Sequence, residues 1–107
     1  MKEHSPIEVN DILNNQNNKP IILDVREKWE YDICHINESV HIPMGQIAER
    51  KVELNMKDTV IVVCHHGIRS RMVAKFLEDS GFADVINLNG GIDSWSREID
   101  QSMPKYV

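Results

Sequence analysis

The chain has 107 residues, of which 41% are hydrophobic and 27% are charged, and its formal net charge is −5. This size and composition are typical of one globular domain and exclude a disordered chain. We therefore expect a single domain over residues 1–107. The acidic balance argues against broad electrostatic binding to nucleic acid or to an anionic membrane.

The N-terminal residues and the cysteine count predict the compartment. Residues 1–6 contain no apolar segment of the kind found in signal peptides, and no apolar run is long enough for a membrane span. The two cysteines, Cys34 and Cys64, are fewer than a secreted disulfide scaffold normally carries. We expect a cytoplasmic protein that has no membrane contact and whose thiols are both reduced.

The first thirty residues predict a helix, a loop, a buried strand and a second helix. Ser5 and Glu8 have the spacing of a capping box around a proline at the first helical position. The polar run over residues 14–20 predicts the loop that ends this helix. The sequence Ile-Ile-Leu-Asp-Val over residues 21–25 predicts a buried strand, and a short helix is expected over residues 26–31.

The rest of the chain continues this alternation. We expect strands over residues 40–43, 59–63 and 85–88, helices over residues 44–54 and 68–79, and a final helix after a turn at residues 89–91. Strands that alternate with helices predict an α/β fold with a mostly parallel sheet and helices on both faces. Ligands bind such sheets at the C-terminal ends of the strands, and Cys64 directly follows one predicted strand.

The stretch Cys-His-His-Gly-Ile-Arg-Ser, residues 64–70, has the clearest chemical pattern in the chain. Gly67 allows a tight turn before a helix, and the N–H groups of such a turn converge on one point with a favourable helix dipole. Together with the permanent cation of Arg69, they would stabilise a thiolate at Cys64. This thiolate could attack sulfur, phosphorus or a disulfide. The spacing alone also allows a buried structural cysteine.

Several ordered motifs, covering nearly the whole chain, resemble the rhodanese-like sulfurtransferases. The motifs are residues 5–9, 23–26, 35–36 with 42–43, 64–70, and 89–95, the last of which contains Gly-Gly-x-x-x-Trp. The resemblance implies a rhodanese-like three-layer fold with a central sheet of about five strands. The chain departs from the family pattern at Cys34 and Glu38, which stand where glycine is usual.

By this resemblance, Cys64 would take a sulfane sulfur from a donor, become a persulfide, and pass the sulfur to a thiophilic acceptor. The loop implied to bind the persulfide comprises His65, His66, Gly67, Ile68, Arg69 and Ser70. Asp24 and Arg26 are expected to brace the site, with His35 as a structural hydrogen-bonding residue. Suitable donors are thiosulfate, mercaptopyruvate or a protein persulfide, and suitable acceptors are a thiol, cyanide or a sulfur-carrier protein. No cofactor is implied.

Two other functions stay open at this point. One is a protein-persulfide carrier or binding module with little thiosulfate activity. The other is a phosphatase-like or arsenate-reductase-like cysteine enzyme. Phosphatases related to this fold hold five residues between cysteine and arginine, whereas Cys64 and Arg69 enclose four, a ring that better fits one sulfur atom.

Other polar residues and the second cysteine have simpler interpretations. His65 and His66 are adjacent and lack the spacing of metal ligands, so we expect no metal. Cys34 could be a small buried side chain, a resolving thiol or a second sulfur acceptor. Glu27 and Glu30 are expected on a solvated face.

Overall fold

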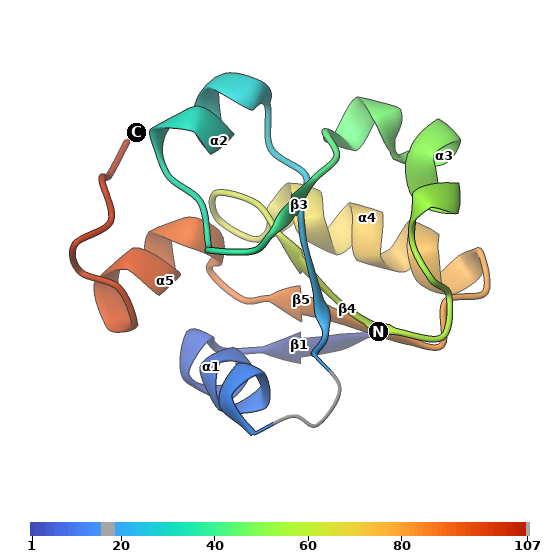
Figure 1. The fold of residues 1–107 in the computed structure, drawn as a ribbon, viewed down its shortest axis with the longest axis horizontal. Helices are drawn as coiled ribbons and strands as arrows, with labels where there is room; N and C mark the ends of the chain where they lie inside the picture. The colour runs from blue at the N-terminus through green and yellow to red at the C-terminus, as the bar shows by residue number, and fades with distance from the viewer. Residues whose placement is uncertain (16–18, 107) are drawn as a thin grey trace.

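The computed structural model describes residues 1–15 and 19–106, which form a five-stranded sheet between layers of helices (Figure 1). The strands are β1 (Lys2–His4), β2 (Ile21–Asp24), β3 (Val40–His41), β4 (Thr59–Val63) and β5 (Asp84–Leu88). Their order in the sheet is β1-β5-β4-β2-β3, and every neighbouring pair is parallel. The predicted α/β fold is confirmed, and the sheet is parallel throughout.

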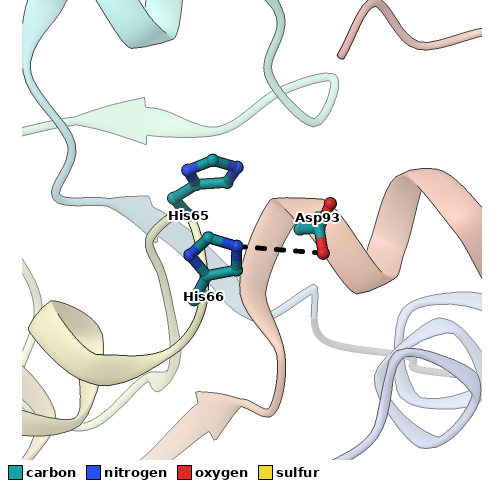
Figure 2. A group of neighbouring side chains, drawn as sticks. All are labelled: His65, His66 and Asp93. Atoms are coloured by element: carbon teal, nitrogen blue, oxygen red, sulfur yellow. Dashed lines mark ion pairs between the residues drawn. The ribbon is translucent and has the colours of Figure 1, made fainter. Parts of the chain in front are cut away.

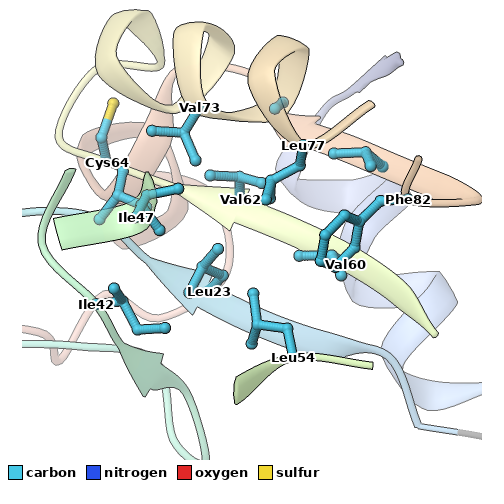
Figure 3. Close-up of a cluster of buried hydrophobic side chains, with 13 residues drawn as sticks. Leu23, Ile42, Ile47, Leu54, Val60, Val62, Cys64, Val73, Leu77 and Phe82 are labelled. Atoms are coloured by element: carbon cyan, nitrogen blue, oxygen red, sulfur yellow. The ribbon is translucent and has the colours of Figure 1, made fainter. Parts of the chain in front are cut away.

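Helices cover both faces of the sheet. They are α1 (Pro6–Asn14), α2 (Lys28–Ile33), α3 (Ile47–Arg50), α4 (Ile68–Asp79) and α5 (Gly91–Glu98). Side chains of β4 alternate between two cores, since successive residues of a strand point to opposite faces. Val60 and Val62 pack with α3 and α4 in one core (Figure 3), and Ile61 and Val63 pack with α1 and α5 in the other. No helix of the described residues is long and apolar enough to span a membrane.

Three predicted boundaries differ from the structure for physical reasons. The single helix expected over residues 44–54 is wrong, because α3 has only four residues and lies between two 3-10 turns. This segment has no continuous apolar face, and its Val52 is 83% exposed. Helix α2 starts two residues later than predicted, because Glu27 serves as its N-cap. The predicted loop over residues 14–20 overlaps the end of α1, and residues 16–18 lie outside the described residues.

Strand β1 was not predicted. Its three residues, Lys-Glu-His, show no apolar alternation, and they become a strand by pairing with β5, where Lys2 lies opposite Ile86 and His4 opposite Leu88. At the other end of the sheet the short strand β3 begins as expected but ends before Pro43. The N–H groups of Ile42 and Met44, on either side of Pro43, donate to the carbonyl oxygens of Asp24 and Val25, so proline is tolerated at this edge of the sheet.

The two departures from the family pattern have different structural consequences. Cys34 has an extended backbone and is buried in the core beneath α1 and α5, whereas Cys64 lies in the core beneath α3 and α4. The side chain of Cys34 is therefore buried, as the first of its three interpretations requires. Glu38 has a φ of +66°, a left-handed conformation in which glycine is unstrained and other residues are not. This conformation explains why glycine is usual at that position.

Candidate active site

Cys64 stands at the carboxyl end of β4, and its side chain is almost completely buried in the loop that leads to α4. The N–H of Gly67 donates a hydrogen bond to the sulfur at 3.0 Å, and the thiol donates to the hydroxyl oxygen of Ser70 at 3.3 Å. Gly67 has a φ of +98°, which lets the backbone turn directly into α4. The first N–H groups of a helix have no intrahelical partners. The N–H of Gly67, the N-cap residue of α4, is the backbone donor that the described residues place on the sulfur.

The N-terminus of α5 holds the back of this loop. The N–H of Ile92 donates to the carbonyl of Cys64 at 2.8 Å, and that of Asp93 donates to the carbonyl of His65 at 3.0 Å. A side chain at Gly91 would place its Cβ 2.3 Å from the Cys64 oxygen and 2.5 Å from the His65 oxygen. The close approach of the two backbones therefore requires glycine at position 91, which is the physical reason for the second glycine of this motif.

Arg69 is bound by Glu30 and is not a free cation of the loop. Its guanidinium donates to both carboxylate oxygens of Glu30, at 2.6 and 2.8 Å. Burial opposes ionisation of Glu30, but the hydrogen bonds from Arg69 and Tyr106 outweigh it and lower the Glu30 pKa to about 2. The prediction of a solvated Glu30 is wrong, since its side chain is only 4% exposed. The charge pattern of a six-residue helix could not show that a distant arginine would cover it.

Tyr106, in the C-terminal segment, completes this group and was not predicted. Its hydroxyl donates to Glu30 at 2.7 Å and accepts from Arg26 at 3.0 Å. Its ring stacks on His65 with 4.1 Å between the ring centroids. Burial and the neighbouring Glu30 carboxylate raise the pKa of Tyr106 to about 12, so the hydroxyl stays a donor. The segment has no periodic pattern from which these contacts could be predicted.

Asp24 and Arg26 form a fully buried ion pair, with 2.7 Å between Oδ2 and Nη2. Arg26 also donates to the carbonyl oxygens of Glu30 at 3.3 Å and of Cys34 at 2.6 Å. These bonds attach the first turn and the C-cap of α2 to the end of β2. Arg26 is thereby linked to the loop through Tyr106 and Glu30 rather than by direct contact.

His35 is exposed and is not brought to the loop. Its ring stacks on Tyr31 at 3.9 Å, and Tyr31 in turn stacks on His41 at 4.4 Å. Its Nδ1 lies 2.9 Å from the Tyr31 carbonyl oxygen. Within the part of the chain that the structure describes, no hydrogen bond joins His35 to residues 64–70.

His65 and His66 project from the loop beside Asp93 of α5 (Figure 2). The two rings stack at 4.0 Å, and Nε2 of His66 lies 3.9 Å from a carboxylate oxygen of Asp93. Burial and the charge of His66 lower the pKa of His65. One ligand atom from each of the three residues lies within 4.8 Å of the others, so this group could hold a metal ion. Asp93 is also paired with Arg97, and this ion pair competes with coordination.

Behind the sulfur, a buried serine and a buried asparagine are hydrogen bonded. The hydroxyl of Ser70, on α4, donates to Oδ1 of Asn87, on β5. Asn87 was not predicted as a site residue because it lies within an apolar strand pattern. Ile68, in contrast, has a side chain that is 67% exposed, so it borders the loop on the outside.

The fold and the loop together define a class of protein. In these α/β domains a parallel sheet presents a cysteine from the end of a central strand to a loop that leads into a helix. The family model described as Rhodanese-like domain matches residues 5–98. The chain belongs to the rhodanese-like domain family, as its motifs predicted.

Three comparisons illustrate this relationship. The chain is 45% identical over 75 residues to "Putative sulfur carrier protein YrkF" of Bacillus subtilis strain 168, covering 70% of this chain and 40% of that protein. It is 36% identical over 75 residues to "Thiosulfate sulfurtransferase GlpE" of Coxiella burnetii, covering 70% of each. A crystal structure of a rhodanese-like domain protein from Staphylococcus aureus superposes with a TM-score of 0.82 at 30% identity, covering 89% of this chain and 91% of that one.

The chain spans less than half the length of YrkF. It also spans 23% of "Adenylyltransferase and sulfurtransferase uba4" of Ogataea parapolymorpha, to which it is 34% identical over 88 residues. These relatives are named as a putative sulfur carrier, a thiosulfate sulfurtransferase, and an adenylyltransferase and sulfurtransferase.

Proposed function

We propose that this domain transfers sulfane sulfur through a persulfide on Cys64. The observation that carries the proposal is the Gly67 N–H at 3.0 Å from a cysteine sulfur that is buried at the end of β4. Four residues separate Cys64 from Arg69, and this short ring suits one added sulfur atom better than a tetrahedral phosphate. The loop from His65 to Ser70 would hold the outer sulfur through its N–H groups.

The reaction consists of two displacements at sulfur. In the first, the thiolate of Cys64 attacks the outer sulfur of the donor, the donor's S–S bond breaks, and the donor leaves with the bonding electrons. Thiosulfate would leave as sulfite, and the proton of the resting thiol passes to solvent. In the second, a nucleophilic acceptor attacks the outer sulfur, and Cys64 leaves as the thiolate. Cyanide would become thiocyanate, and a thiol would become a persulfide.

The pairing of Arg69 with Glu30 favours the second candidate function, a protein-persulfide carrier with little thiosulfate activity. Both oxygens of Glu30 bind the guanidinium of Arg69, so a small dianion meets a neutralised arginine at the loop. The persulfide of a protein donor carries no second anionic group like the sulfite part of thiosulfate. Its reaction with Cys64 therefore depends less on a free cation at Arg69. In this case the domain would be loaded by, and discharged to, other proteins.

One experiment tests the proposal and separates the two candidates. The protein is incubated with thiosulfate or with glutathione persulfide, and its intact mass is measured before and after cyanide is added. We expect the gain of one sulfur atom, its removal by cyanide as thiocyanate, and no gain in Cys64→Ser. Cys34→Ala is the matched control and should load like the wild type. Hydrolysis of aryl phosphates without any sulfur gain would refute the proposal, and loading by the persulfide alone would identify a carrier.

A further inference from the structure

Three side chains beside the Cys64 loop have the ligand types of a transition-metal site. His65 and His66 belong to the loop, and Asp93 lies in the first turn of α5 (Figure 2). One nitrogen from each imidazole and one carboxylate oxygen lie within 4.8 Å of one another. The ligand atoms of a tetrahedral zinc ion lie about 3.4 Å apart, so these three atoms need to approach one another by at most about 1.4 Å.

The backbone holds the loop and α5 together at this point. The N–H of Asp93 donates to the carbonyl of His65 at 3.0 Å, and the N–H of Ile92 donates to the carbonyl of Cys64 at 2.8 Å. Gly91 permits this close approach because it has no side chain. His65 and Asp93 are therefore held beside each other by the main chain, which decreases the entropy that is lost when the ligands assemble around an ion.

Small movements of the imidazole rings are sufficient to complete the site. The ring of His65 stacks on His66 and on Tyr106, with centroid distances of 4.0 and 4.1 Å, so its position is fixed by packing. The side chain of His66 is 62% exposed, and its Nε2 lies 3.9 Å from Oδ2 of Asp93. An exposed ring can rotate without losing core contacts, so His66 can turn its nitrogen toward an ion that the other two side chains hold.

We propose that His65, His66 and Asp93 bind a zinc ion at the edge of the Cys64 loop. Two imidazoles and one carboxylate are ligands that zinc accepts, and three protein ligands leave a position open for water or an anion. Magnesium and calcium prefer oxygen ligands, so the two nitrogens select against them. The spacing of adjacent histidines predicted no metal, because the sequence does not show that α5 brings Asp93 to them.

The thiol of Cys64 is not a ligand in this arrangement. Its sulfur is buried and is hydrogen bonded to the N–H of Gly67 and to the hydroxyl of Ser70. Among the described residues, the group of ligand atoms within 4.8 Å of one another does not include this thiol. The zinc site and the sulfur-carrying site are therefore neighbours that use different side chains, and the ion should bind when the thiol is absent.

Arg97 competes with the ion for Asp93. Its guanidinium is paired with Oδ2 of Asp93, the same oxygen that faces Nε2 of His66. Zinc binding at this oxygen must displace Arg97, which reduces the affinity of the site. Removal of the arginine side chain should therefore strengthen zinc binding, whereas loss of any ligand should weaken it.

A zinc ion at this position would supply the positive charge that Arg69 lacks. The guanidinium of Arg69 is neutralised by Glu30, whereas a zinc ion bound to one carboxylate keeps a net charge of about +1. His65 directly follows Cys64, so the distance from the ion to the sulfur is comparable with the screening length of about 8 Å at physiological salt. The ion would therefore attract an anionic donor such as thiosulfate to the loop. This consequence rests on the proposed function of Cys64.

The binding test is a calorimetric titration of Zn²⁺ into the full chain without a histidine tag. The protein carries Cys34→Ala and Cys64→Ser, so no thiol can bind the metal. We expect one zinc ion per chain. Cobalt provides a second measurement, because four-coordinate Co²⁺ absorbs visible light much more strongly than the hydrated ion, and this absorption should appear when Co²⁺ is added.

Four variants in this background identify the ligands. His66→Ala and Asp93→Asn should each weaken zinc binding by more than about tenfold and abolish the cobalt absorption. Arg97→Ala should bind zinc more tightly. His35→Ala is the matched control, because His35 is also exposed and stacked on an aromatic ring but lies outside the group, and its affinity should be unchanged. Circular dichroism establishes that each variant is folded.

Two binding results would overturn the proposal: no zinc binding without the thiols, or the same affinity in folded His66→Ala as in its parent. Sulfur loading of protein with both cysteines intact tests the consequence. Zinc should lower the KM for thiosulfate at least about twofold in the wild type and leave it unchanged in His66→Ala. An unchanged KM with zinc bound would refute the attraction of the donor. Failure of sulfur loading with and without zinc would refute the proposed function and leave the binding result intact.

Discussion

Replacement of Glu30 by glutamine tests the ion pair that holds Arg69 beside the loop. Glutamine has nearly the same shape but removes the negative charge and one of the two acceptors for the guanidinium. We expect Glu30→Gln to destabilise the protein at neutral pH and to release Arg69 toward the loop. A released cation should lower the KM for thiosulfate if thiosulfate is a donor.

The size of the effect follows from the pKa of Glu30. Its fall from an ordinary value of 4.5 to about 2 corresponds to about 3 kcal/mol of stabilisation, at about 1.4 kcal/mol per pKa unit. The side chain of Arg69 is 36% exposed, so water compensates part of the lost interaction. We therefore expect a loss of about 1–3 kcal/mol in the free energy of unfolding.

The pH dependence gives this prediction a specific sign. Because the pKa of Glu30 is lowered in the folded state, its contribution is present above pH 4.5 and is lost as the pH falls toward 2. Urea denaturation should show that the difference in free energy of unfolding between the wild type and Glu30→Gln decreases as the pH falls across this range. Glu53→Gln, which breaks an exposed bidentate pair with Arg50, is the control and should change stability far less. A difference between wild type and Glu30→Gln that is independent of pH would refute the reasoning.

Three other substitutions test separate features. Gly91→Ala would place a Cβ 2.3 Å from the Cys64 oxygen, so thermal melting should show a loss of about 2–4 kcal/mol in the free energy of unfolding. Intact mass should show that the variant no longer gains sulfur. Stability and sulfur loading equal to those of the wild type would contradict the close approach. Glu38→Gly relieves a φ of +66° and should raise the free energy of unfolding by about 0.5–1 kcal/mol, whereas a decrease would contradict the strain. Tyr106→Phe removes the donor to Glu30 but keeps the ring, so it should lower the free energy of unfolding by about 1 kcal/mol. It should also slow sulfur loading less than Tyr106→Ala does. Equal loading rates in the two variants would show that the ring has no role.

The elements that the sequence predicted well have strong local signals. The buried β-branched run of β4 and the helix α4 that ends before glycine have the predicted bounds, because hydrophobic burial and the helix stop are both encoded within a few residues. The polar strand β1 has no such signal. It exists because β5, more than eighty residues away, offers an edge for pairing.

Some residues of the candidate site could likewise be predicted from the sequence, and others could not. The loop around Cys64 is continuous in sequence, so its spacing could be interpreted from the residues alone. Glu30, Asn87 and Tyr106 come from α2, β5 and the C-terminal segment, and only the folded chain brings them to the loop. Each has an ordinary local context, as a helix glutamate, a strand asparagine or a residue of an irregular segment. Their roles depend on partners 17 to 84 positions away in the sequence.

The placement of the two cysteines in separate cores has a consequence for the lifetime of bound sulfur. Cys34 and Cys64 lie in cores on opposite faces of the sheet, so the thiol of Cys34 cannot reach and reduce a persulfide on Cys64. A loaded molecule would keep its sulfur until an external nucleophile enters the loop, and its rate of unloading would depend on the concentration of that nucleophile. The intact mass of loaded protein without added thiol should therefore decay at the same rate in the wild type and in Cys34→Ala. Faster decay in the wild type would show that Cys34 does reach the persulfide on Cys64.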